Sequence, residues 1–268
     1  MAFGVYVHVP FCARRCDYCD FATWTDRAHL MEAYAAACVA DLERHYAAAA
    51  PEATSVFFGG GTPSLLPAPL LVSILEAIPR APGAEVTVEC NPDAVDPAKL
   101  AAYRAAGVNR LSFGVQSMRR HVLESLGRTH DPAGVGRAVA WARGAGFDNI
   151  NVDLIYGADG ESLDDWQATV DAALALDPAH VSAYALTVEP GTPLHRRIAA
   201  GEVAAPDDDD QADKYLAAVE RLGAAGLESY EISNWARPGH ECRHNLLYWT
   251  MGEYQGIGCA AHSHRLGR

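Results

Sequence analysis

The sequence predicts an α/β fold in which parallel strands alternate with helices, as a wound sheet or a barrel. Short apolar, β-branched runs alternate with Ala- and Leu-rich segments that repeat apolar residues at helical spacing. Repeated strand-then-helix units require parallel strands joined by right-handed crossovers. A chain of 268 residues, half of them hydrophobic, is long enough for one large core of this type.

Six strand–helix units account for most of the chain. We expect strands near 3–9, 54–58, 84–89, 109–114, 148–155 and 180–186. We expect helices near 27–48, 68–78, 97–106, 132–145, 162–175 and 210–225. Gly107, Gly146 and Gly226 each follow a predicted helix, as C-cap residues do, and Pro97 and Pro132 stand near helix starts, where a missing N–H is tolerated.

The composition changes after residue 226. Residues 227–268 are rich in aromatics, His and Gly. We therefore divide the chain into a barrel-like unit, 1–226, and a C-terminal segment, 227–268. This segment is expected to begin with a last strand near 227–232 and to continue as an irregular layer over one end of the barrel.

Charge and cysteine content restrict the class of protein. The chain carries 21 basic and 34 acidic residues, a formal charge of −13, which argues against a wide nucleic-acid interface. The N-terminus has no positive region followed by a long apolar run, and no stretch has the apolar length of a membrane span. Seven cysteines without a secretory signal indicate reduced thiols. These features predict a cytoplasmic protein with no nucleic-acid partner and no membrane span.

Chemically distinctive residues stand where the predicted strands end. A cysteine cluster follows the first strand, and a glycine run, 59–61, follows the second. In the next four units the corresponding residues are Glu89, Gln116, Asp153 and Tyr184. Because the carboxyl ends of parallel strands share one side of the sheet, we expect these residues to form one composite site.

The cysteine cluster has the strongest motif. Cys12, Cys16 and Cys19 lie on one short loop, and three thiolates can bind three irons of a [4Fe–4S] cluster. The fourth iron then remains open and can chelate the methionine part of S-adenosylmethionine (SAM). The alternative is zinc, which requires a fourth ligand. His8 could serve, but it lies within a strand pattern, so the spacing favours the iron–sulfur cluster.

These motifs, taken together, resemble the HemN/HemW branch of the radical SAM superfamily over essentially the whole chain. The matching stretches are Tyr6 to Cys19, Phe57 to Ser64, Glu89 to Pro92, Ser112 to Ser117, Asp153 to Gly157, Tyr230 to Asn234 and Cys242 to Trp249. The resemblance implies a radical SAM partial (β/α)6 barrel with an incomplete C-terminal layer. It also implies a smaller helical domain beyond Arg268, where this sequence stops.

The resemblance also implies a set of SAM-binding residues. They are Tyr6, Tyr18, Gly60, Gly61, Thr62, Glu89, Gln116, Arg128 and Asp153. In the family the glycine loop passes the SAM amino group, and an acid at the position of Glu89 holds the ribose. Gln116, Arg128 and Asp153 match residues that contact a second SAM in the oxidase branch. Ordinary structural roles remain open: a helix cap for Glu89, a surface ion pair for Arg128 and a buried barrel polar group for Asp153.

Two features separate the branches of the family. Phe21 stands where dehydrogenases of the HemN type carry a further cysteine. His244, Asn245, Tyr248 and Trp249 match the motif associated with heme in HemW-type chaperones. A neutral imidazole is a suitable heme ligand and aromatic rings can cover a porphyrin, although His244 could equally be a core residue packed beside Trp249.

The resemblance therefore implies a heme chaperone that carries the cluster with exchangeable SAM and transfers heme to an acceptor protein. The rival activity is an oxygen-independent coproporphyrinogen III dehydrogenase of porphyrin biosynthesis. The implied partners are heme or a porphyrin, the acceptor, and an electron donor such as a flavodoxin or a ferredoxin. Cys242 is a candidate second heme contact. No residue is assigned a catalytic role.

Overall fold

The computed structural model describes residues 2–47 and 50–267. Positions 48 and 268, which belong to the expected first helix and to the C-terminal segment, lie outside the described residues. The strands are β1 (Phe3–Val9), β2 (Ala53–Gly60), β3 (Arg80–Cys90), β4 (Arg110–Gln116), β5 (Asn149–Tyr156), β6 (His180–Ala185), β7 (Glu228–Glu231), β8 (Asn234–Ala236) and β9 (Glu253–Ile257).

Nine α-helices are assigned in the described residues. They are α1 (Met31–Ala47), α2 (Ala68–Glu76), α3 (Pro97–Ala105), α4 (Arg120–Ser125), α5 (Pro132–Gly144), α6 (Leu163–Leu174), α7 (Pro193–Ala199), α8 (Asp208–Ala224) and α9 (Arg243–Trp249). Short 3-10 turns occupy Ala28–Leu30, Pro63–Leu65 and Pro92–Ala94. No helix in the described part is long and apolar enough to cross a membrane.

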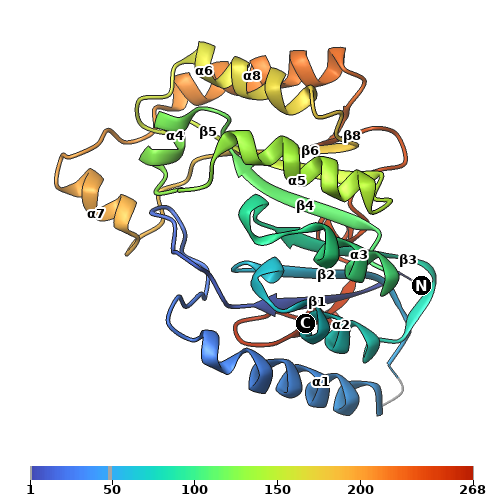
Figure 1. Cartoon of the computed structure of the whole chain (residues 1–268). Coiled ribbons are helices and arrows are strands. Elements are labelled where there is room, and N and C mark those ends of the chain that lie inside the picture. Colours follow the sequence, from blue (N-terminus) through green and yellow to red (C-terminus); the bar gives the residue numbers. More distant parts are fainter. Residues whose placement is uncertain (1, 48–49, 268) are drawn as a thin grey trace.

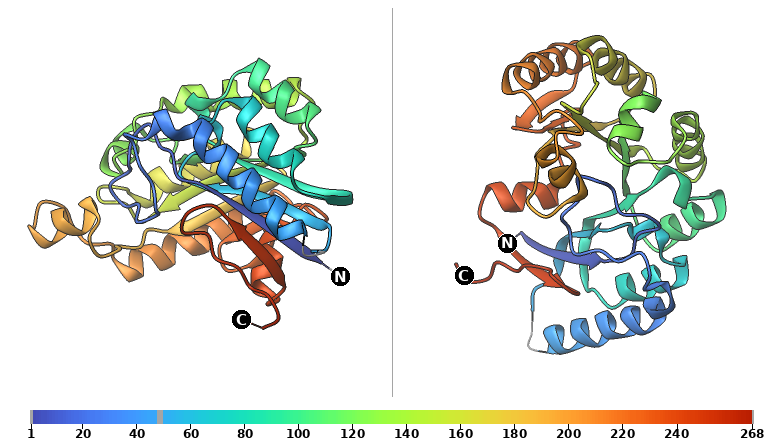
Figure 2. Two further views of the ribbon diagram at one scale, coloured as in Figure 1. Left: turned by 90° about the horizontal axis from the view of Figure 1, so that it is seen from below. Right: turned by 90° about the vertical axis from the view of Figure 1, so that its left-hand side faces the viewer.

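The strands form one curved, open sheet in the order β7-β8-β6-β5-β4-β3-β2-β1-β9. Strands β1 to β6 are parallel neighbours, β9 adds in parallel beside β1, and β8 and β7 add antiparallel beyond β6. The edge strands β7 and β9 do not pair with each other, so the barrel stays open. Helices cover the outer face, whereas α9 lies on the other face against β1 and β2 (Figures 1 and 2).

Local sequence signals explain where the helices begin. Asp96 and Asp131 cap α3 and α5 by accepting hydrogen bonds from backbone N–H groups, and each is followed by a proline at the first helical position. Ser162 and Asp165 form a reciprocal capping box at the start of α6. These interactions satisfy N–H groups that have no partner inside the helix.

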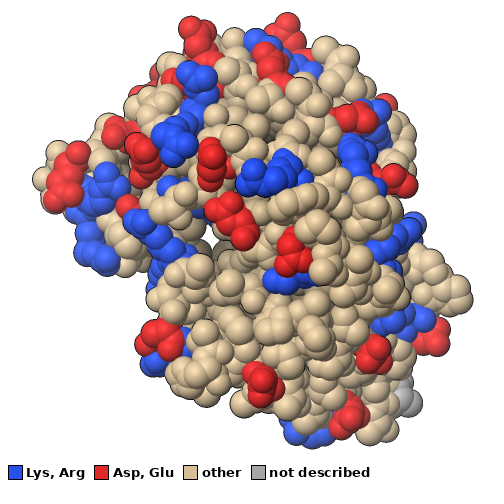
Figure 3. Space-filling model, in the orientation of Figure 1, with Lys and Arg blue, Asp and Glu red and all other residues tan. Residues whose placement is uncertain are grey.

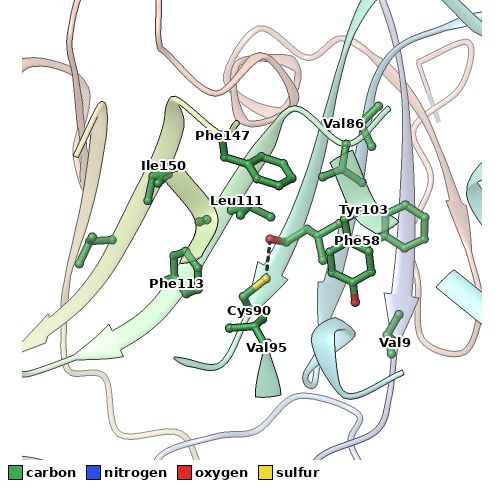
Figure 4. Packing of buried hydrophobic residues seen from close by; sticks show 14 of the residues in the cluster. Val9, Phe58, Val86, Cys90, Val95, Tyr103, Leu111, Phe113, Phe147 and Ile150 are labelled. Carbon is green, nitrogen blue, oxygen red and sulfur yellow. Dashed lines mark hydrogen bonds between the residues drawn. The ribbon is translucent and has the colours of Figure 1, made fainter. Parts of the chain in front are cut away.

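The main core lies between the sheet and the outer helices. Figure 4 shows Val9, Phe58, Leu111 and Phe113 from the strands beside Tyr103 of α3. The strands supply many apolar side chains to this core, because helices cover the outer face of the parallel sheet. The inner face differs, since several of its buried residues are polar and line the space inside the barrel.

The six expected strand–helix units are confirmed, with small shifts at their ends. Helices α4 and α7 were not expected, because six- and seven-residue helices carry little periodicity. The expected last strand corresponds to β7. The rest of the C-terminal segment is more regular than expected, since it forms β8, α9 and β9 and extends the sheet at both edges.

Candidate functional site

The carboxyl ends of the parallel strands surround a cavity of about 620 Å³. In Figure 3, Lys and Arg side chains gather at the left-hand edge of the molecule beside a hollow in the surface. The cavity is lined by Cys12, Cys16, Tyr18, Cys19, Gly60, Gly61, Thr62, Glu89, Gln116, Arg128 and Asp153. The structure thus brings the cluster cysteines and eight of the nine expected SAM residues to one rim; that they bind these groups stays a prediction.

The cysteine loop is held against the barrel by its own backbone. Cys12 N–H donates to Trp24 O at 3.1 Å, and Trp24 N–H donates to Pro10 O at 2.8 Å. Cys12, Cys16 and Cys19 are free, half-buried thiols. Burial raises the pKa of Cys12 and of Cys19. Protonated thiols at neutral pH would have to lose their protons to bind metal, since the thiolate is the ligand.

The glycine loop passes very close to the cysteine loop. Gly61 N–H donates to Val9 O at 2.8 Å, and a Cβ at Gly61 would lie 2.8 Å from Phe11 O and 3.0 Å from Cys12 Sγ. Gly60 has a φ of 107°, and a Cβ there would meet the His8 ring at 2.5 Å. Both positions therefore require glycine. This contact fits a cluster on the cysteines with a ligand beside it on the glycine loop.

Glu89 is fixed at the centre of the cavity wall. Its Oε2 accepts a hydrogen bond from Gly60 N–H at 3.2 Å. Burial, followed by repulsion from Asp153, raises the pKa of Glu89 to about 8. Burial also raises the pKa of Asp153, whose oxygens accept hydrogen bonds from Ser112 and Asn151. Acids with such raised pKa values concentrate at functional sites.

Gln116 is held in an unusual backbone conformation. Its φ is 66°, in the left-handed region, and the pairing of β4 with β5 shifts register between Gly114 and Gln116. A bulge of this kind redirects a side chain at the end of a strand. Backbone strain of this type costs about 1–3 kcal/mol and is typical of functional sites.

An arginine and a histidine complete the cavity. Arg128 is half-buried and donates from Nη2 to Tyr18 Oη at 3.2 Å, and its Nε has no hydrogen-bond partner among the described residues. His130, which the sequence did not single out, is buried, and in the same part of the chain neither of its ring nitrogens has a partner. Burial, with repulsion from Arg128, lowers the pKa of His130 to about 4. Neutral His130 and charged Arg128 are thus available to a polar ligand.

Tyr6 and the segment around His244 lie elsewhere, in a second cavity of about 330 Å³ inside the barrel. Tyr6 does not line the first cavity; its hydroxyl lies 3.1 Å from His8 Nδ1. His244 is 1% exposed, with Nδ1 at 3.0 Å from Ser55 Oγ and Nε2 at 2.9 Å from Tyr248 Oη. Burial lowers the pKa of His244 to about 3, so its ring is neutral.

The segment that follows Cys242 has the expected helical geometry. His244 and Tyr248 share one face of α9, as their hydrogen bond shows. Tyr248 and Trp249 are 42% and 53% exposed, whereas Cys242 is buried with its Sγ at 3.6 Å from Glu85 Oε1. A buried ligand nitrogen beside exposed aromatics is the arrangement on which a heme site here would depend.

Comparison with known proteins gives one consistent relationship. A family model described as the radical SAM superfamily matches residues 6–173. A protein of Mycobacterium tuberculosis named heme chaperone HemW is 48% identical over 98% of this chain and 69% of its own length. Heme chaperone HemW of Escherichia coli is 39% identical over 97% of this chain and likewise 69% of its own length. This chain thus spans about two thirds of these relatives.

A solved structure supports the same fold. Coproporphyrinogen III oxidase (HemN) from Escherichia coli, described as a radical SAM enzyme, superimposes with a TM-score of 0.85. The match covers 98% of this chain and 64% of that chain, and at 23% sequence identity it establishes the fold alone. The relatives found by sequence identify the family within this superfamily. The chain therefore belongs to the radical SAM superfamily and, within it, to the HemW family.

Proposed function

We propose that this chain is a heme chaperone that holds a [4Fe–4S] cluster with exchangeable SAM, binds heme and transfers it to an acceptor protein. The observation that carries the proposal is the segment from His244 to Trp249, where a neutral, buried imidazole lies beside exposed aromatic side chains. The relatives named heme chaperone HemW support it. A cytoplasmic location and an external electron donor, a flavodoxin or a ferredoxin, belong to the same proposal.

The first cavity supports the cluster and SAM. Cys12, Cys16 and Cys19 would hold the cluster, which when bound supplies an open iron for the methionine part of SAM and an electron for its sulfonium. The glycine loop excludes side chains from the space beside the cysteines, so a ligand can approach the backbone. Glu89 offers a carboxyl group to hydroxyl donors, and Arg128 keeps N–H groups free for an anionic group.

The heme site would use α9. Ser55 Oγ lies beside Nδ1 of His244, so Nε2 of the neutral ring is the nitrogen that would bind iron through its lone pair. The Tyr248 hydroxyl now lies against Nε2, so it must rotate away when a ligand binds there. Tyr248 and Trp249 would then cover one face of the porphyrin.

Heme titration tests this proposal. We expect the wild-type chain to give a shifted Soret band that His244→Ala weakens or displaces, with or without the cluster. Cys242→Ala, at the N-cap of α9, tests the candidate second contact: an unchanged band would remove Cys242 from the site. Heme binding that is indifferent to His244 would contradict the assignment.

The rival activity, that of a coproporphyrinogen III dehydrogenase, is tested by a separate assay. Phe21, 59% exposed at the edge of the first cavity, occupies the position of the further cysteine in HemN-type dehydrogenases. We expect no decarboxylated porphyrin from coproporphyrinogen with SAM and reductant under anaerobic conditions. A longer HemW relative assayed in parallel separates this result from an effect of chain length. Turnover by this chain would favour the dehydrogenase instead.

Glu89 provides a test of the SAM site. Its carboxyl group lies beside Gly60 in the first cavity, where it would accept ribose hydroxyl hydrogen bonds. We expect Glu89→Ala to weaken SAM binding by about 1–3 kcal/mol, measured by equilibrium dialysis of the cluster-loaded protein. Glu76→Ala, at the end of α2 and outside the cavity, is the matched control. Unchanged SAM affinity in Glu89→Ala would leave Glu89 a structural role only.

A further inference from the structure

The second cavity reaches from the SAM side of the barrel to α9. Glu89, Asp153 and Tyr184 line both cavities, so the two adjoin inside the barrel. The part beyond them is lined by Arg110, Ser112, Asn151, Ser182, Asn234, Cys242, His244, Asn245 and Tyr248. None of these residues lines the first cavity.

Arg110 is the unusual member of this set. It is the first residue of β4 and is 2% exposed. Among the described residues its Nε has no hydrogen-bond partner, and its guanidinium takes part in none of the ion pairs. Burial works against its charge, but attraction from Cys242, Glu85, Tyr230 and Asp153 outweighs this and raises the pKa of Arg110. A buried charge without a partner is strongly destabilising, so such groups are normally paired.

The polar side chains near Arg110 form hydrogen bonds with one another. Asn151 Nδ2 donates to Ser112 Oγ at 2.6 Å and to Ser182 Oγ at 3.0 Å. His180 Nδ1 lies 2.7 Å from Asn151 Oδ1, and its Nε2 lies 2.9 Å from Tyr230 Oη. Arg110 takes part in none of these hydrogen bonds, and it lines the cavity beside them.

Within the described part of the chain, the acids nearby attract Arg110 without forming an ion pair with it, and their hydrogen bonds are with other groups. Oε1 of Glu85 faces His244 N–H at 3.3 Å and Cys242 Sγ at 3.6 Å. Glu89, with a pKa of about 8, is mostly protonated at neutral pH. Asp153 accepts hydrogen bonds from Ser112 and Asn151. The guanidinium of Arg110 therefore has room for an added anionic partner, and a planar fork of N–H donors suits a carboxylate.

The rim of the cavity indicates what carries that carboxylate. Tyr184 and Tyr248 line the cavity and are 43% and 42% exposed, and Trp249, the residue after Tyr248 on α9, is 53% exposed. A volume of about 330 Å³ is at the lower end of the range of roughly 300–1,000 Å³ for small-molecule pockets. A cavity of this size can hold the short polar arm of a ligand, while the flat, apolar body of that ligand stays at the aromatic rim.

We propose that the second cavity is a carboxylate subsite, in which Arg110 binds the acid arm of a ligand whose flat apolar body rests on Tyr184, Tyr248 and Trp249. The inference rests on the proposed function, under which the arm is a heme propionate and Arg110 orients the heme relative to His244. The bond is a charge-assisted hydrogen bond, with no covalent or redox step.

The test compares heme with heme dimethyl ester, in which both propionates are neutral and the iron is unchanged. We expect wild-type protein to bind the free acid at least ~10-fold more tightly than the ester in Soret titrations, as one charge-assisted pair allows. Arg110→Gln should bind both forms alike. Arg243→Gln, an exposed arginine of α9 that donates to Gly83 O, should keep the wild-type preference. A wild-type protein without the preference, or an Arg110→Gln variant that retains it, would overturn the subsite.

A second probe separates this inference from the heme proposal. 3-Phenylpropionate and 3-phenylpropionamide carry the same aromatic body and differ only in the charge of the arm. In protein-observed NMR titrations we expect the acid, and not the amide, to shift signals of the second cavity in wild type, and neither to do so in Arg110→Gln. If heme does not bind but this pattern holds, the heme proposal fails and the subsite stands. If the probe shows no dependence on Arg110, the subsite fails even if heme binds.

Discussion

Replacing Cys12, Cys16 and Cys19 together by Ala is expected to abolish iron binding. Anaerobically reconstituted wild-type protein should hold about four irons and show a broad absorbance shoulder near ~400 nm, as a cubane cluster does. The three thiols are the cysteines that line the first cavity together with Cys90, and the glycine loop leaves no side chain between them and the cavity. The triple variant should retain neither signal, because its loop has no thiolate left to bind iron.

Two cysteines serve as matched controls. Cys38→Ala removes a buried thiol of α1, and Cys90→Ala removes a buried thiol at the end of β3 whose Sγ donates to Val88 O at 3.6 Å. Both variants should keep the full iron content. Stoichiometric zinc with no iron after reconstitution would reject the cluster, and so would a triple variant that still holds four irons.

Much of the barrel could be predicted because each unit has its own local signals. The buried parallel strand β1 is a nearly continuous apolar run, and the intervening helices have caps and helical periodicity. The site residues on the first rim followed from the topology: residues just past parallel strands must meet at one side. The short α7 and the strand β9 had weaker signals, since β9 contains Tyr, Gln and Gly and only one β-branched residue.

The second cavity could not have been predicted from the same rules. Whether His244 faces the barrel interior depends on how α9 packs against β1 and β2, which is a tertiary property. Arg110 did leave a signal, because a charged residue at the start of a buried strand needs a reason to be there. His130 carried none, since a histidine before a helix cap is ordinary in a loop. Tertiary packing alone shows that both side chains are buried and that Arg110 Nε and both ring nitrogens of His130 have no hydrogen-bond partner in the described part of the chain.

A buried ion pair holds α8 against the loop that follows β5. Lys214 of α8 and Glu161 both have fully buried side chains, with Lys214 Nζ at 3.3 Å from Glu161 Oε2 and at 2.6 Å from Asp210 Oδ2. Glu161 Oε2 also accepts from Gly157 N–H at 2.8 Å. Burial raises the pKa of Glu161. Because Gly157 comes four residues after Asp153, this pair also supports the rim of the first cavity.

Lys214→Met is expected to lower the free energy of unfolding by about 3–5 kcal/mol, because it leaves Glu161 buried without its cation. Urea unfolding of the cluster-free, reduced protein measures the change. Arg221→Met, which breaks the partly exposed pair with Asp171, should cost only about 0–1 kcal/mol. The double variant Lys214→Met/Glu161→Gln should recover part of the loss, since the unpaired charge is then gone. A loss below 1 kcal/mol in Lys214→Met would mean that Glu161 becomes neutral at little cost and that packing, rather than the ion pair, holds α8 in place.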